Sequence, residues 1–165
     1  MSDAFDRWVE RRHKPPRDRR SIPAELYAAV MSLPEADRSD RQRVNEVVRH
    51  HDEARREGRT VWLYIDDYRD GRRRAAGEPG WIKVFESADV AERWFKENDP
   101  EGVAWEYEVG GGRARGSVWL YSHDPESRDV GDVDWVRLFA SQGCAEKWVE
   151  QNDPTGKIWE YPVQE

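Results

Sequence analysis

One stretch of this chain occurs twice, and this repeat constrains the architecture more than any other feature. Val61-Trp62-Leu63-Tyr64 recurs at residues 118–121. Each copy continues through a Trp-x-x-x-Phe run and an amphipathic segment to Asn-Asp-Pro-x-Gly and Trp-Glu-Tyr. Because the two copies fill most of residues 60–165, a duplicated supersecondary unit should form most of the molecule.

Each copy is predicted to contain two strands, a helix and a third strand. In the first copy the strands are residues 60–65, 81–85 and 103–109, and the helix covers 88–97 after Ser87 as its N-cap. The second copy gives strands at 118–122, 135–139 and 157–163 and a helix after Ser141. The prediction is an α+β fold, in which N-terminal helices precede two tandem ββαβ repeats that form a pseudo-twofold body. Its parts are a helical segment with a basic arm (1–59), the first repeat (60–109), a Gly-rich linker (110–116) and the second repeat (117–165).

Side-chain alternation indicates how the strands are covered. In the first strand Val61 and Leu63 oppose Trp62 and Tyr64, so both faces are apolar. A helix can cover one face. We expect the other repeat to cover the aromatic face, through aromatic faces packed together or through a joined sheet. The alternative is an aromatic cleft open to a ligand.

The N-terminal segment is predicted to contain three helices, at residues 4–13, 22–33 and from a Ser39 capping box to about Glu57, with Gly58 as the stop. The third helix has a narrow apolar stripe, which we expect to pack on the repeats. A partner-binding or helix-turn-helix element is the alternative.

Charge is unevenly distributed. Residues 1–60 hold 14 Lys or Arg and 12 Asp or Glu, whereas residues 61–165 hold 13 and 22. A basic arm between residues 7 and 20 could contact phosphates, but we favour its lying on the acidic half of the same chain. Its candidate residues are Arg11, Arg12, Lys14, Arg17, Arg19 and Arg20.

Composition indicates the cellular location that the chain suits. The single Cys excludes an intramolecular disulfide, and no apolar run has the length of a membrane span or a signal peptide. Nine Trp residues argue against a disordered chain. A cytoplasmic protein of bacterial type, without membrane contact, is the simplest interpretation.

The motifs Val-Trp-Leu-Tyr, Val-Phe-x-Ser, Ala-Glu-x-Trp-Phe, Glu-Asn-Asp-Pro-Glu-Gly and Trp-Glu-Tyr resemble those of short, single-copy, uncharacterised bacterial proteins. The resemblance covers about residues 61–109 and, less closely, 118–163, where Cys144 and Thr155 depart from it. It implies a self-contained module able to pair with itself. It implies no activity.

No residue pattern specifies a reaction. Cys144 lies near a helix N-terminus, but Val90 matches it in the first copy, which favours a small apolar core slot. His50 and His51 have no third metal ligand, so a solvated face is favoured there. His123-Asp124 and the matching Asp66-Asp67 follow strand ends without a nucleophile. We therefore predict a protein that is not an enzyme and has no cofactor or metal.

Residues shared by the copies are those that the scaffold needs, and residues that differ are the better candidates for function. Eight Trp residues form matched pairs: Trp62 with Trp119, Trp81 with Trp135, Trp94 with Trp148, and Trp105 with Trp159. The differing segments are the two hairpin loops and the N-terminal segment. The predicted partner-binding residues are Asp66, Asp67, Tyr68, Asp70, His123, Asp124, Glu126 and Arg128.

The sequence therefore predicts a protein-binding module that acts as an inhibitor, immunity protein, antitoxin or regulatory adaptor. Self-association stays open. The alternatives are an acidic decoy of nucleic acid and a small-molecule sensor or enzyme that uses the aromatic cleft. Direct nucleic-acid binding through the basic arm is the least favoured.

Overall fold

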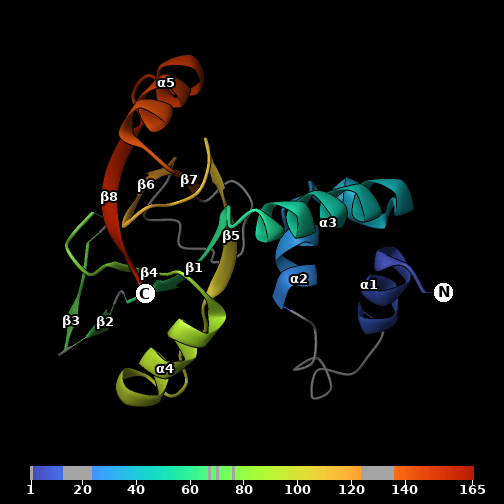
Figure 1. Cartoon of the computed structure of the whole chain (residues 1–165), viewed down its shortest axis with the longest axis horizontal. Helices are drawn as coiled ribbons and strands as arrows, with labels where there is room; N and C mark the ends of the chain where they lie inside the picture. The colour runs from blue at the N-terminus through green and yellow to red at the C-terminus, as the bar shows by residue number, and fades with distance from the viewer. Residues whose placement is uncertain (1, 13–23, 67, 70, 76, 124–135) are drawn as a thin grey trace.

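The computed structural model describes residues 2–12, 24–66, 68–69, 71–75, 77–123 and 136–165 (Figure 1). These residues combine helices and strands, which confirms the α+β class. The elements are α1 (Ala4–Arg12), α2 (Ala24–Met31), the 3-10 helix η2 (Glu35–Ser39), α3 (Arg41–Arg56), β1 (Thr60–Ile65), β2 (Tyr68–Arg69), β3 (Arg72–Arg73), β4 (Ile82–Phe85), α4 (Ala88–Asn98), β5 (Trp105–Gly110), β6 (Ser117–Ser122), β7 (Arg137–Phe139), α5 (Gln142–Asn152) and β8 (Lys157–Gln164).

Six of the strands close into a barrel in the order β1-β4-β8-β6-β7-β5. β1 pairs antiparallel with β4 and β5, and β6 pairs antiparallel with β7 and β8. Two parallel pairs, β4 with β8 and β5 with β7, join these three-stranded halves. The sheet is therefore joined, as one of the two predicted arrangements had it, and closure leaves it without free edges.

The expectation that the aromatic faces pack together is wrong. Val61 and Leu63 are each 2% exposed and belong to the barrel interior. Trp62 and Tyr64 point the other way and pack with Phe85 and with residues of α4. Closing a sheet turns one set of alternating side chains inward, so the aromatic set faces outward and the helix covers it.

The second half is covered in a similar way. Trp119 and Tyr121 pack outside the barrel with Phe139 and with Trp148 of α5. The interior of both halves is continuous and filled with side chains: Val61, Leu63, Trp81, Ile82, Val84, Val109, Val118, Leu120, Val136, Leu138 and Tyr161. A barrel filled in this way has a packed core rather than a ligand chamber.

The Asn-Asp-Pro-x-Gly motif has a structural purpose. The Tyr64 hydroxyl donates to Asp99 Oδ2 at 2.6 Å, and the Tyr121 hydroxyl donates to Asp153 Oδ2 at 2.7 Å. Burial, and then the bond to Asp153, raises the pKa of Tyr121 to about 12. Each bond ties the central strand of one half to the turn that follows its helix.

The helices α1, α2 and α3 share a separate core made of Trp8, Leu26, Ala29, Val30, Val44 and Val48. Asp40, rather than Ser39, caps α3, because its side chain accepts from the backbone N–H of Arg43 and Ser39 belongs to η2. The prediction that the stripe of α3 packs on the repeats is only partly right. Most of the stripe faces α1 and α2, and the C-terminal turns of α3 reach the barrel beside β5 (Figure 1).

Most boundaries shift by one or two residues from the prediction, and two differences affect the description of the first half of the barrel. The loop at residues 66–80 contains the short antiparallel pair β2 and β3. β5 begins at Trp105 rather than at Val103, which is 60% exposed. Trp135, predicted to start a strand, lies outside the described residues.

Candidate functional site

The first predicted binding residue, Asp66, is buried and forms an ion pair within the chain. Its side chain is 5% exposed and its Oδ2 accepts from Arg74 Nη1 at 2.8 Å, while Lys83 Nζ lies 4.0 Å away. Arg74 also donates to the carbonyl of Gly80 at 2.8 Å. The Asp66 carboxylate therefore holds the hairpin loop against the end of β1, and its contact with a partner stays a sequence-based prediction.

The second predicted group is only partly described. His123 is exposed, and its Nδ1 lies 3.5 Å from Asp153 Oδ2. The backbone of Tyr68 belongs to β2. Asp67, Asp70, Asp124, Glu126 and Arg128 lie outside the described residues.

The basic arm is described only at its start. Arg11 and Arg12 end α1. Lys14, Arg17, Arg19 and Arg20 lie outside the described residues, so the arm stays a sequence-based prediction.

The structure also places Cys144 and the two adjacent histidines, His50 and His51. Cys144 packs beside Ala145 and Phe139, in line with the apolar slot predicted from Val90. His51 is not on a solvated face, because it is 8% exposed and its Nε2 lies 3.3 Å from Glu106 Oε2. His50 is exposed, with its Nδ1 3.3 Å from Glu108 Oε2.

Glu106 is the centre of the contact between α3 and the barrel. Its carboxylate is 1% exposed and accepts two hydrogen bonds from Arg55, at 2.9 Å from Nε and 2.7 Å from Nη2. Burial by itself would raise the pKa of Glu106, but the contacts with His51 and Arg55 outweigh it and lower the pKa to about 2. Alternation predicts Glu106 on the polar face of β5. Only the docked helix explains why that face is buried.

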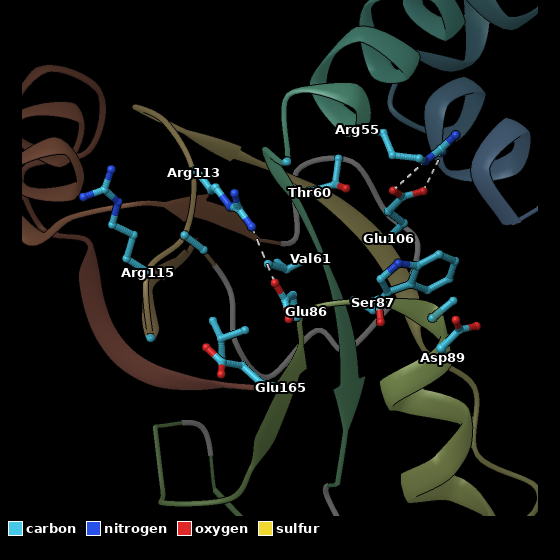
Figure 2. A pocket seen from close by; sticks show the side chains of 16 residues that line it. Arg55, Thr60, Val61, Glu86, Ser87, Asp89, Glu106, Arg113, Arg115 and Glu165 are labelled. Atoms are coloured by element: carbon cyan, nitrogen blue, oxygen red, sulfur yellow. Dashed lines mark hydrogen bonds and ion pairs between the residues drawn. The ribbon is translucent and has the colours of Figure 1, made fainter.

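A cleft of about 710 Å³ opens beside this contact (Figure 2). Its walls come from the end of α3, the first half of β1, the start of α4, the linker before β6 and the end of β8. The lining residues are Arg55, Gly58, Thr60, Val61, Trp62, Glu86, Ser87, Ala88, Asp89, Glu106, Arg113, Ala114, Arg115, Gly116, Val163 and Glu165. Trp62 is the one aromatic residue among them, so this is a mixed-charge cleft and differs from the aromatic cleft considered from the sequence.

Charges of both signs face the cleft from opposite sides. Arg113 and Arg115 lie on one side, and Asp89 lies across from them at the start of α4 (Figure 2). Arg113 Nη2 is 3.6 Å from Glu86 Oε1, and both side chains are more than half exposed. Within the described part of the chain, Arg115, Asp89 and Glu165 form no ion pair. These charges are therefore available to a ligand.

Sequence reasoning missed these cleft residues, although one signal was present. When the copies are aligned at the helices, Glu86 and Asp89 match Ala140 and Gly143. The copies therefore differ at the strand-to-helix turn as well as in the hairpin loops. The contributions of Arg55 and of the linker needed the tertiary structure, because they come from outside the repeats.

Comparisons with known proteins give no relative. No protein-family model, no curated protein and no solved structure matches the chain. In the described ranges, no group of three or more His, Cys, Asp or Glu side chains is arranged to hold a metal ion. Nor does any described helix combine the length and apolarity needed to cross a membrane.

Proposed function

We propose that this protein is a non-enzymatic binding module whose mixed-charge cleft holds a segment of another protein. The observation that carries the proposal is a set of charges gathered in one cleft, Arg115, Asp89 and Glu165, which form no ion pair with any residue that the structure describes. Complementary charges give a protein contact its register and its specificity. An extended segment with an acidic residue toward Arg115 and a basic residue toward Asp89 would match the cleft.

An inhibitor, immunity protein, antitoxin or adaptor in the bacterial cytoplasm remains the proposed biological setting. The chemistry of the cleft supports binding over catalysis. Its described lining includes no His, Cys or Lys, and the Ser87 hydroxyl accepts from the backbone N–H of Val90 as a helix cap. Carboxylates are therefore the only candidate general bases in the described lining.

The pairing of described arginines also supports a protein partner over a nucleic acid. Arg41 contacts Asp3 and Asp6, Arg55 contacts Glu106, and Arg59 contacts Glu57 and Glu108. Guanidinium groups engaged in this way are less available to phosphates. The same pairs neutralise part of the acidic surface, which weakens the case for a nucleic-acid decoy.

We also propose that the barrel is a duplicated ββαβ unit with a pseudo-twofold relation between its halves. The strand registers support this. Trp62 pairs with Glu106 and Trp119 pairs with Glu160, while Val61 pairs with Tyr107 in the same register as Val118 with Tyr161. The two parallel strand pairs, β4–β8 and β5–β7, would then be equivalent contacts between the two copies of the unit.

Affinity capture with charge-reversal variants tests the binding function. The full chain, Asp89→Lys and Arg115→Glu are each used as bait in extracts of the native cell, and any captured protein is then purified and its binding to each bait is measured. Matched controls are Glu92→Lys on the same helix and Lys157→Glu on β8, which are exposed and do not line the cleft. We expect both cleft variants to weaken binding about tenfold or more, as loss of a charge pair at an interface does. Equal binding by all five proteins would contradict the assignment of the cleft.

A further inference from the structure

The barrel already binds one helix end through a glutamate on its outer surface. Arg55, in the last turn of α3, forms a bidentate ion pair with Glu106 of β5. Arg59, just beyond the helix, contacts Glu108 on the same face of the strand at 2.7 Å. The outer face of β1 and β5 is thus a surface that fits an arginine-bearing helix.

The second half has the same strand pair in the same register. Trp119 of β6 pairs with Glu160 of β8, as Trp62 of β1 pairs with Glu106 of β5. The environments of the two glutamates differ. Glu106 is 3% exposed, whereas Glu160 is exposed and its Oε1 accepts a hydrogen bond from the Ser117 hydroxyl at 2.7 Å.

The position of the N-terminal helices explains this difference. They lie beside β5, and β8 lies at the far side of the barrel from them (Figure 1). Alternation along β8 places Ile158 and Pro162 on the same face as Glu160. Ile158 packs against the cluster beside α5, whereas Pro162 is exposed like Glu160. Among the described residues, no arginine contacts the Glu160 carboxylate.

We propose that the outer face of β6 and β8, around Glu160, is a docking surface for an arginine-bearing amphipathic helix of a partner protein. Charge complementarity and the use of the matching face within this chain carry the inference. It rests on the proposed duplication of the barrel and is independent of the mixed-charge cleft. The α3 helix of a second copy is not the intended occupant, because its Arg55 is bound to Glu106.

The experiment uses the sequence of α3 as the probe, because Arg55 of this helix binds the matching glutamate of β5 within the chain. A lactam-stapled peptide with the sequence of residues 40–57 is added to the ¹⁵N-labelled full chain, and amide and indole shifts are followed by NMR. We expect shifts in β6 and β8, including Trp119, with saturation below about 1 mM, the millimolar range of weak complexes. Glu160→Gln in the protein, or the Arg55→Ala change in the peptide, should each weaken the binding at least tenfold.

Several outcomes would overturn the proposal. They are absence of shifts in β6 and β8 up to 1 mM peptide, shifts that Glu160→Gln leaves unaltered, and shifts confined to β5 that disappear with Glu106→Gln. Shifts of β8 that grow with protein concentration alone would assign the face to a second copy and would also refute a partner helix. Asp89→Lys, at the start of α4, should leave peptide binding unchanged, so failure of this inference is distinguishable from failure of the cleft function.

Discussion

Replacement of Glu106 by Gln tests the central contact between the helices and the barrel. The side chain keeps its shape but loses the charge that Arg55 and His51 surround. At neutral pH the variant leaves the Arg55 guanidinium against a neutral amide. We therefore expect a large loss of stability from a change of one atom.

The size of the expected loss of stability follows from the pKa of Glu106, which falls from an ordinary value of 4.5 to about 2 in the folded protein. One pKa unit corresponds to about 1.4 kcal/mol, so the carboxylate contributes on the order of 3 kcal/mol to the free energy of unfolding at pH 7. Because the folded pKa is depressed, this contribution is complete above the unfolded value. It is lost as the pH falls from about 4.5 toward 2.

The assay is urea unfolding followed by Trp fluorescence, for the wild type and Glu106→Gln, at pH 7 and at intervals down to pH 2.5. The difference between the two proteins should be largest at pH 7 and should shrink through the acid range. Glu160→Gln is the matched control, because it changes the same residue type at an exposed position and should alter stability by less than about 0.5 kcal/mol. Equal effects of the two substitutions, or a difference that does not depend on pH below 4.5, would refute the reasoning.

Two further substitutions test the scaffold. Tyr121→Phe removes the hydroxyl that is the main cause of the low pKa of Asp153, about 2. Carboxyl NMR should therefore show the pKa of Asp153 rising toward 3.8. An unchanged pKa would contradict the hydrogen bond between Tyr121 and Asp153. Gly77→Ala should destabilise the chain by about 2 kcal/mol or more in urea, because its φ of +82° is left-handed and a Cβ there would collide with the Trp159 indole. Gly71→Ala, with a φ of +73° and no neighbouring atom within 4 Å, should cost about 1 kcal/mol from backbone strain alone; equal losses would refute the collision.

Local sequence signals predicted the elements well where they depend on a few neighbouring residues. Ser87 and Ser141 cap α4 and α5, and their hydroxyls accept from the backbone N–H groups of Val90 and Cys144. The predicted strand at 60–65 matches β1. Helix caps and strand alternation depend on residues a few positions apart in the sequence. They can therefore be predicted without the tertiary structure.

The candidate site was much harder to predict from the sequence. The sequence indicates a partner-binding position for Asp66 after a strand end, yet its side chain is buried and ion-paired with Arg74. The differences between the copies that the sequence indicates most clearly are the hairpin loops, beside the separate N-terminal segment. Glu86 and Asp89 carry a weaker signal, because they form a charged cleft only together with the linker arginines.

The sequence by itself determined the mix of helices and strands, the place of most of these elements, and the alternation within the strands. Only the tertiary structure decided that the halves join through β4–β8 and β5–β7 into a closed barrel. Backbone hydrogen bonds between distant strand edges leave no side-chain signature, and alternation shows which residues share a face without showing what covers it. For this reason Glu106 and Glu160, alike in sequence and register, differ in burial: the helices that bury Glu106 pack beside β5, at the far side of the barrel from β8.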